Sequence, residues 1–138
     1  MAEVSAVESG VFPKGEQVVS DSFIGAVWLQ PLVADDGVFD VVISNVTFAP
    51  GARNKWHKHP GGQILLVTGG VGCYQERGKP IQQLKPGDVV KIAPDVEHWH
   101  GASPDSWFSH LAISTRVSQG VVQWLGPVTD EEYKASDD

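Results

Sequence analysis

Two pairs of histidines, each pair separated by a single residue, are the part of this sequence best suited to chemistry. His57 and His59 form the first pair and His98 and His100 the second, so four of the five histidines fall in H-x-H patterns. On an extended strand, residues i and i+2 project to the same side, so both imidazoles of a pair can converge on one point. A turn at residues 60–62 can then return the side-chain carbonyl of Gln63 to that point.

Converging imidazoles with a nearby amide oxygen have the composition of a metal site. Neutral imidazole suits zinc, manganese, iron, nickel or copper. No thiolate narrows this choice, because Cys73 is the single cysteine and lies in a different expected strand, where we interpret it as an inert core thiol. The alternative is that the histidines are strand-edge residues hydrated by solvent. The repeated spacing favours metal binding.

The elements that must position these histidines are strands. Short apolar runs alternate with Gly, Pro and Asp turns, and almost nothing has helical period, which predicts an all-β chain of two-sheet sandwich or jelly-roll type. We expect one domain over residues 1–138, with a barrel core at about 23–127, an N-terminal arm and an acidic C-terminal tail. Near the end, Thr129 and Glu132 can form the capping box of a short helix. The expected strands cover residues 26–32, 38–48, 55–59, 63–68, 71–76, 81–84, 89–92, 97–100, 107–114 and 121–124.

The composition argues against several kinds of partner. A formal net charge of −7 disfavours nucleic acid and anionic membranes, which need a basic face. No apolar stretch approaches membrane-spanning length, and the N-terminus lacks the basic start and apolar run of a secretory signal. We therefore expect a cytoplasmic protein with a small-molecule substrate.

With these features in place, the chain resembles the cupins, whose jelly-roll barrel, a double-stranded β-helix, holds a metal inside. The first cupin motif, G-x5-H-x-H-x3-E-x6-G, is matched at full spacing by Gly51, His57, His59, Gln63 and Gly70, with Gln in place of Glu. The second motif, G-x5-P-x-G-x2-H-x3-N, is matched at Gly87 and His98, but Ala93, Asp95 and Ala102 stand where Pro, Gly and Asn are usual. The resemblance implies the fold and four metal ligands: His57, His59, Gln63 and His98.

Residues 56–63 and 98–102 resemble, more narrowly, small single-domain bacterial cupins that include the manganese-dependent hydroxynitrile lyases. This similarity runs from about Phe23 to Tyr133 and implies one divalent ion, with manganese favoured over iron, zinc or nickel. Gln63 brings no negative charge, so the ion would keep about two positive charges and favour Lewis-acid chemistry over redox chemistry. The resemblance also implies a homodimer or homotetramer, in which the apolar strand at residues 26–29 could pair across a subunit edge.

Two further histidines are candidates for proton transfer. His100 should point to the same side of its strand as His98, which makes it the leading general acid or base, although it could instead orient a metal ligand. His110 lies in an otherwise apolar strand and either faces the barrel interior as a second catalytic candidate or is a hydrogen-bonded core histidine.

The same alternation predicts the pocket wall and the positions of two tryptophans. We choose Ser44, Val46 and Phe48 as pocket-facing because a small residue among them leaves room for substrate, with Ala112 and Ser114 on the face that carries His110. Trp56 and Trp99 alternate with the histidines, so we expect them to face away from the metal and to pack between the sheets.

Three functions remain open from the sequence. The favoured one is a metal-dependent lyase, most specifically one that cleaves a cyanohydrin to an aldehyde and cyanide, with His100 or His110 moving the proton. The second is a cupin dioxygenase or other oxidoreductase, which would prefer iron. The third is a non-catalytic module that binds a metal or small molecule.

Overall fold

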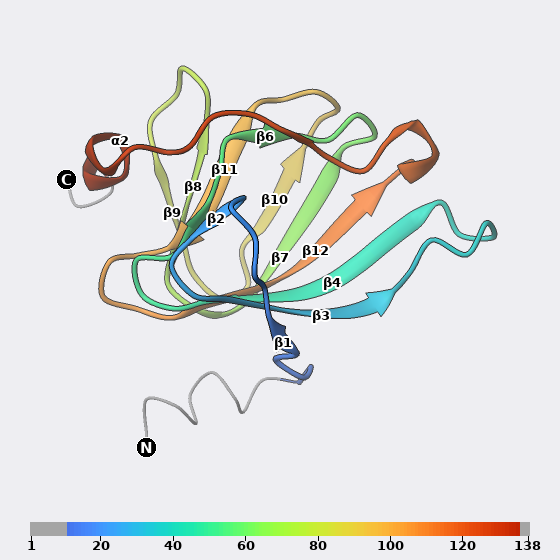
Figure 1. Cartoon of the computed structure of the whole chain (residues 1–138), viewed down its shortest axis with the longest axis horizontal. Coiled ribbons are helices and arrows are strands. Elements are labelled where there is room, and N and C mark those ends of the chain that lie inside the picture. Colours follow the sequence, from blue (N-terminus) through green and yellow to red (C-terminus); the bar gives the residue numbers. More distant parts are fainter. Residues whose placement is uncertain (1–10, 136–138) are drawn as a thin grey trace.

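The computed structural model describes residues 11–135 and consists of two curled antiparallel sheets that face each other (Figure 1). The first sheet has six strands in the order β1-β3-β4-β12-β7-β10. The second has seven strands, with β13-β6-β11-β5-β2 in order and β8 joining β11 to β9. The predicted all-β barrel with a short C-terminal helix is therefore confirmed. The expected tail residues Asp137 and Asp138, and the first ten residues of the arm, lie outside the described residues.

The elements have the following bounds. The strands are β1 (Glu16–Gln17), β2 (Phe23–Ile24), β3 (Val27–Val33), β4 (Val41–Phe48), β5 (Arg53–Asn54), β6 (His57–Lys58), β7 (Gln63–Gly70), β8 (Gly72–Glu76), β9 (Gln82–Leu84), β10 (Val89–Ile92), β11 (His98–Ala102), β12 (Phe108–Thr115) and β13 (Gln123–Trp124). A 3-10 turn, η1, spans Val117–Gln119, and helix α2 spans Asp130–Lys134. Within residues 11–135, no helix is long and apolar enough to cross a membrane.

Strand β12 lies inside the first sheet, since it pairs along its whole length with β4 on one side and from Phe108 to Ser114 with β7 on the other. Its alternation places His110, Ala112 and Ser114 on the inner face, as the sequence pattern predicts. Leu111 and Ile113 consequently lie on the outer face of this sheet.

Apolar side chains fill much of the space between the sheets. Phe48, Leu65 and Phe108 are fully buried, and Val67, Tyr74 and Ile92 join the same cluster. This packing holds the sheets together, while the polar residues of the histidine motifs share the interior with it.

Both tryptophans of the histidine motifs face away from the barrel interior, but their expected packing between the sheets was wrong. Trp56 and Trp99 belong to a second cluster with Val128 and Tyr133, which come from the C-terminal segment. This segment covers the outer face of the second sheet. Because Trp99 points to the opposite side of β11 from His98 and His100, it is buried beneath this segment and not in the core between the sheets.

Several strand boundaries differ from the expected ones. The expected strand 55–59 is shortened to β6, because Lys55 N–H bonds to Ser22 O and Trp56 N–H bonds to Gly126 O, and β5 before it was missed. The strand expected from residue 38 begins at Val41, since Asp36 Oδ1 accepts hydrogen bonds from the N–H groups of residues 38 and 39 and folds them into a turn. The two-residue strands β1 and β2 were missed, as they are too short to show a period.

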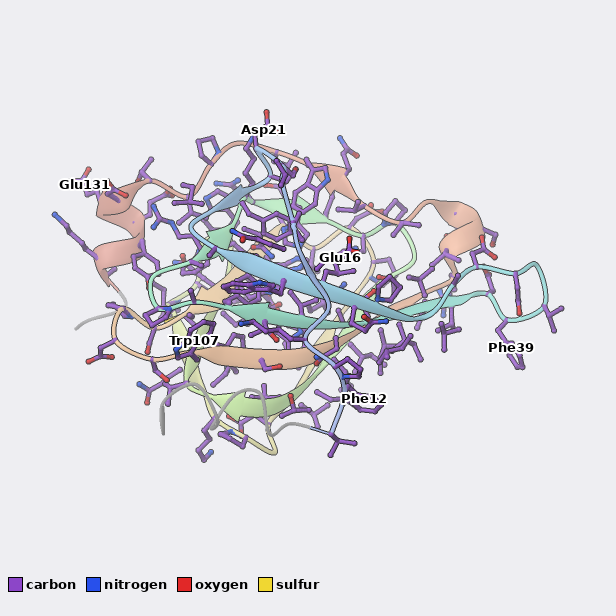
Figure 2. All side chains as sticks on the ribbon, turned by 60° about the horizontal axis from the view of Figure 1, so that its bottom comes forward. Phe12, Glu16, Asp21, Phe39, Trp107 and Glu131 are labelled. Atoms are coloured by element: carbon purple, nitrogen blue, oxygen red, sulfur yellow. The ribbon has the colours of Figure 1, made fainter. Side chains whose placement is uncertain are left out.

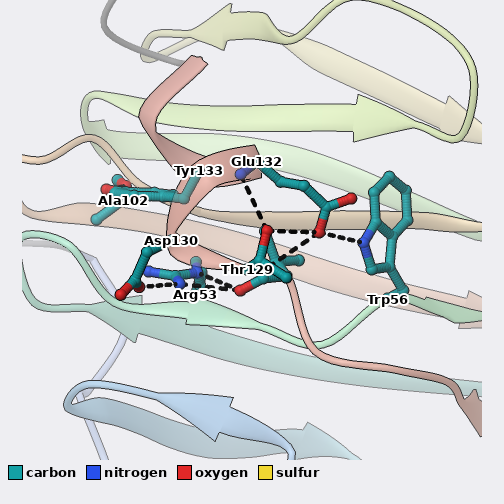
Figure 3. Close-up of polar contacts among 8 residues, drawn as sticks. Arg53, Trp56, Ala102, Thr129, Asp130, Glu132 and Tyr133 are labelled. Carbon is teal, nitrogen blue, oxygen red and sulfur yellow. Dashed lines mark hydrogen bonds and ion pairs between the residues drawn. The ribbon is translucent and has the colours of Figure 1, made fainter.

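The C-terminal helix forms as its sequence predicts. Thr129 Oγ1 accepts a hydrogen bond from Glu132 N–H, and the Glu132 side chain accepts one from Thr129 N–H, which completes the capping box. These contacts are drawn in Figure 3.

Candidate metal centre and its cavity

The pairing of β6 with β11 brings the two histidine motifs together. His57 lies directly opposite His98, with ring centroids 4.2 Å apart. The His59 ring is centred 5.0 Å from that of His57 and 5.3 Å from that of His98. All three residues are buried. Three of the four expected ligands thus share one small volume inside the barrel.

Each of these three histidines has its Nδ1 beside a backbone carbonyl oxygen. A carbonyl can only accept a hydrogen bond, so Nδ1 carries the proton, and Nε2 of the neutral ring keeps its lone pair. Such a hydrogen bond fixes both the tautomer and the ring orientation of a metal-binding histidine. The Nδ1 to oxygen distances are 2.7 Å from His57 to Lys55, 2.7 Å from His59 to Val121 and 2.9 Å from His98 to Val96.

Gln63 supplies an oxygen from the opposite sheet. Its Nε2 donates to Ser114 Oγ at 3.3 Å, which leaves Oε1 as the group without a partner. Among residues 11–135, Gln63 Oε1 is buried without a hydrogen-bond partner, as are His59 Nε2 and His98 Nε2. Leaving a buried acceptor unsatisfied costs about 1–3 kcal/mol. Three such acceptors on adjacent residues fit a divalent cation.

The histidines are neutral at physiological pH because burial disfavours the charged form. Burial lowers the pKa of His98 to about 4, and it lowers the pKa of His59 in the same direction. The pKa of His57 lies well below its ordinary value, first through burial and then through repulsion from His98 and His59. Protons therefore compete little with a cation for the three Nε2 atoms.

His100 lies beside these residues and belongs to a polar group of its own. Nitrogens of His57, His98 and His100 lie within 4.8 Å of one another, so His100 is part of an alternative three-histidine set. Its Nδ1, however, is 3.2 Å from His110 Nε2, and its backbone N–H donates to Asn54 Oδ1 at 2.9 Å. The Asn54 amide nitrogen lies 3.3 Å from both ring nitrogens of His100. His100 is thereby engaged by two neighbours, whereas His98 Nε2 has none.

Asn54 is the site residue that sequence reasoning missed, and an irregular pairing explains why. Gly101 pairs with Arg53 and His98 pairs with His57. The two positions are three residues apart in β11 but four residues apart in the segment that contains β5 and β6. One extra residue, as in a β-bulge, reverses the alternation between Asn54 and His57. Both side chains consequently line the same cavity although they are three residues apart.

The site opens into a cavity of about 260 Å³. Its wall carries His57, His59, His100 and Gln63 and is otherwise mostly apolar, which suits a small molecule with a polar group. His98 and His110 are not among the lining residues. All five expected pocket residues are in the lining, which comprises Phe23, Leu29, Val42, Ser44, Val46, Phe48, Asn54, His57, His59, Gln63, His100, Ala112, Ser114, Val121, Val122 and Trp124.

Part of this wall comes from the segment after β12, which the sequence pattern did not connect with the site. Trp124 pairs with His57, its ring centroid lies 4.9 Å from that of His57, and it meets Phe23 edge-on at 5.9 Å. Val121 contributes the carbonyl that holds His59. The only sequence signal was the short apolar run at residues 121–124.

The buried Arg53 anchors the C-terminal segment that follows residues 121–124. Its Nε and Nη2 donate to Val128 O at 3.2 and 2.9 Å, and Nη2 pairs with Asp130 at 2.9 Å (Figure 3). Tyr133 OH donates to Ala102 O at 2.6 Å, and the guanidinium lies 4.5 Å from the centre of the Tyr133 ring. The C-terminal segment is therefore tied to the same sheet that carries the histidines.

Known proteins resemble this chain over most of its length. A curated protein named (R)-mandelonitrile lyase, from Granulicella tundricola, is 42% identical over 132 residues, which cover 96% of this chain and 98% of that protein. A crystal structure of a cupin-like protein from Thermotoga maritima is 56% identical, has a TM-score of 0.88, and is matched over 90% of this chain and 94% of its own. The DMSP lyase DddQ from Ruegeria pomeroyi, at 19% identity and a TM-score of 0.68 over 84% of this chain and 64% of its own, shares the fold.

The family model described as Cupin domain matches residues 44–108, which include both histidine motifs. Taken with the 42% identity over nearly the whole chain and the jelly-roll arrangement of the sheets, this match shows that the chain belongs to the cupin family.

Proposed function

We propose that this protein is a metal-dependent hydroxynitrile lyase, which cleaves a cyanohydrin to an aldehyde or ketone and hydrogen cyanide. The observation that carries the proposal is the set of unpartnered acceptors His59 Nε2, Gln63 Oε1 and His98 Nε2 around a small, mostly apolar cavity. The similarity to a protein named (R)-mandelonitrile lyase supports the choice of reaction.

The proposed ligands are His57, His59, Gln63 and His98, through three Nε2 atoms and one Oε1 atom. This all-neutral set leaves the charge of a divalent ion uncompensated. When bound, such an ion supplies Lewis acidity that lowers the pKa of a neighbouring hydroxyl group. We propose manganese as the ion, although nitrogen and oxygen donors also suit iron, zinc and nickel.

His100 is the proposed proton acceptor. It is the histidine that lines the cavity without belonging to the proposed ligand set, and its ring is held by Asn54 and His110. Burial and the neighbouring His110 hold the pKa of His100 well below its ordinary value, so the ring is neutral and can accept a proton. His110 Nε2 then lies within hydrogen-bond reach to stabilise the protonated ring.

The reaction balances without an external oxidant or reductant. The hydroxyl proton of the cyanohydrin passes to His100, the carbon–carbon bond to the nitrile breaks, and its electron pair leaves with cyanide. Cyanide then takes the proton from His100, which restores the neutral ring. The apolar wall, including Val46 and Phe48, accommodates the hydrocarbon part of the substrate.

The test is anaerobic turnover of mandelonitrile by protein reconstituted with manganese, with benzaldehyde release followed by absorbance. We expect turnover without oxygen, and we expect His100→Ala to lose most of it, on the order of 100-fold or more, while keeping one ion per chain. His98→Ala should instead lose the ion itself. Both variants should be checked for native folding by circular dichroism.

Three results would contradict the proposal. Oxygen consumption stoichiometric with product would indicate a dioxygenase. A stoichiometric ion with no turnover of any cyanohydrin would indicate a binding module. Full turnover in His100→Ala would move the proton-transfer role to another group, with His110 the next to test.

A further inference from the structure

Residues 117–122, which follow β12 and which we call the strap, form part of the cavity wall. Val121 and Val122 both belong to the lining. Val121 is 42% exposed and Trp124, just beyond the strap, is 39% exposed, whereas the other lining residues are buried or partly buried. The exposed part of the wall is the entrance, so a small molecule reaches the cavity past these two side chains.

One side of the entrance is fixed by the second sheet. Trp124 lies in β13 and pairs with His57, and Phe23 lies in β2 and pairs with Asn54. The rings of Phe23 and Trp124 meet edge-on with centroids 5.9 Å apart. Because strand pairing holds both rings in place, any widening of the entrance must come from the strap.

The strap has little regular structure of its own. It contains the 3-10 turn η1, and the next strand begins only at Gln123. The backbone is left-handed on both sides of η1, with φ of 49° at Arg116 and 113° at Gly120. Glycine adopts such a conformation without strain, so Gly120 gives the chain freedom beside the entrance. Segments of this kind open at lower free energy than the strands that flank them.

Asp40, in the loop of the β3–β4 hairpin, holds the beginning of the strap. Its carboxylate accepts hydrogen bonds from Ser118 N–H at 2.7 Å and from Ser118 Oγ at 2.8 Å. The carbonyl oxygen of Asp40 also accepts a hydrogen bond from Val117 N–H at 3.4 Å. Figure 2 shows this hairpin, with Phe39 labelled, projecting past the sheet beside η1. These hydrogen bonds keep the strap against the barrel.

His59 joins the other end of the strap to the candidate metal centre. Its Nδ1–H donates to Val121 O at 2.7 Å, while its Nε2 has no hydrogen-bond partner among residues 11–135. A cation at Nε2 withdraws electron density from the ring, which makes Nδ1–H a stronger donor to Val121 O. The closed strap in turn holds the ring in the orientation that binds the cation. Such coupling is reciprocal, because each event changes the equilibrium of the other by the same factor.

We propose that the strap is a gate that controls entry to the cavity, and that the bound ion favours its closed position through His59. The open strap admits the substrate, and the closed strap places Val121 and Val122 over the entrance and excludes water from the cavity. The inference rests on the proposed function for the substrate that the gate admits. The movement itself depends on Asp40, Ser118 and the ion, and it can be measured without any cyanohydrin.

The first test measures entry in the metal-free protein. Ser44→Cys places a thiol on the cavity wall, and Cys73→Ala removes the native cysteine, so the rate of reaction with iodoacetamide reports access to the cavity. Adding Asp40→Ala should raise this rate on the order of 10-fold, because the strap loses both hydrogen bonds to the carboxylate. Ser118→Ala removes one of these bonds and should have a smaller effect in the same direction.

Asp35→Ala is the matched control for Asp40→Ala. Asp35 lies in the same exposed hairpin, and its Oδ1 accepts a hydrogen bond from Gly37 N–H at 3.2 Å, within the hairpin itself. The substitution removes the same charge from the same loop, so the labelling rate should stay at its starting value. Circular dichroism should show native folding in every variant.

The second test measures the coupling to the ion by hydrogen exchange and mass spectrometry of the wild type, with and without manganese. The N–H groups of Gln119 and Gly120 bond to carbonyl oxygens of their own turn at 2.9 Å, so their exchange reports opening of the strap without direct contact to Asp40. Manganese should slow this exchange on the order of 5-fold or more. By reciprocity, Asp40→Ala should weaken manganese binding by a comparable factor, whereas Asp35→Ala should leave it unchanged.

The possible results separate the gate from the reaction. An unchanged labelling rate in Asp40→Ala would overturn the gate. Equal exchange of the strap with and without one bound ion per chain would overturn its coupling to the ion. Protein that shows both effects but turns over no cyanohydrin would refute the lyase and leave the gate standing. Protein that binds no manganese would refute the metal centre and the coupling, and the labelling rate would still decide on the gate.

Discussion

The acid sensitivity of the metal-free protein should depend strongly on His110. This side chain is fully buried, next to Phe48 and Phe108, with ring centroids 5.7 and 5.3 Å away. Burial lowers its pKa from the ordinary 6.5 to about 4. Replacing His110 with Asn removes the titrating ring while keeping a small polar group, so the variant should lose part of the pH dependence of folding.

The direction and size of the pH effect on the free energy of unfolding follow from proton linkage. Between pH 6.5 and 4 the unfolded chain binds a proton at His110, whereas the folded chain leaves the buried ring neutral. The free energy of unfolding is therefore unaffected by His110 above pH 6.5 and decreases as pH falls through this window. The loss from this one residue reaches about 3 kcal/mol by pH 4. Removing His110 also relieves its repulsion of His100, which reduces the acid sensitivity further.

The assay is urea unfolding of chelator-treated protein at several pH values between about 7 and 4, with the free energy of unfolding extrapolated to water. The wild-type curve should fall more steeply toward acid than that of His110→Asn, and the gap should widen to about 3 kcal/mol. Leu84→Ala is the matched control, since Leu84 belongs to the same buried core and its truncation removes no titratable group, so it should shift the curve about equally at every pH. Parallel curves for wild type and His110→Asn would refute the reasoning.

Three other predictions follow from the site and its supports. Gln63→Glu should slow the loss of the ion to a chelator and lower turnover, each on the order of 10-fold, because the carboxylate offsets the charge of the ion. Metal analysis after dialysis against a chelator and steady-state kinetics measure the two effects. Asn54→Ala should keep one ion per chain while turnover falls on the order of 10-fold, since the His100 ring loses a contact at 3.3 Å; an unchanged turnover number would contradict it. Arg53→Met should lower the free energy of unfolding by about 3 kcal/mol, because it leaves the buried Val128 O without its hydrogen bonds. Asp130→Asn should lower it by under about 0.5 kcal/mol, because the Asp130 side chain is 88% exposed. Equal losses for the two variants in urea unfolding would show that the ion pair, and not the buried hydrogen bonds, holds the C-terminal segment.

The sequence by itself determined the class of the fold and which side chains gather at the candidate site. Side chains alternate on a strand, so the two H-x-H pairs had to place His57 with His59, and His98 with His100, on one side of their strands. The same local rule selected the inner face of β12 and the pocket-facing side of β4. The capping box at Thr129 depends on residues three apart and was also readable from the sequence.

Tertiary structure alone decided how these parts meet. The extra residue between Asn54 and His57 reverses the alternation of side chains, and no local pattern signals it. Within this irregular stretch, Trp56 N–H bonds to Gly126 O, 70 residues away along the chain. The carbonyl of Val121 that holds His59, and the ring of Trp124 beside His57, likewise come from a segment distant in sequence. Alternation is set by each strand's own backbone, whereas register and the path of the C-terminal segment depend on non-local hydrogen bonds and packing, and these complete the site.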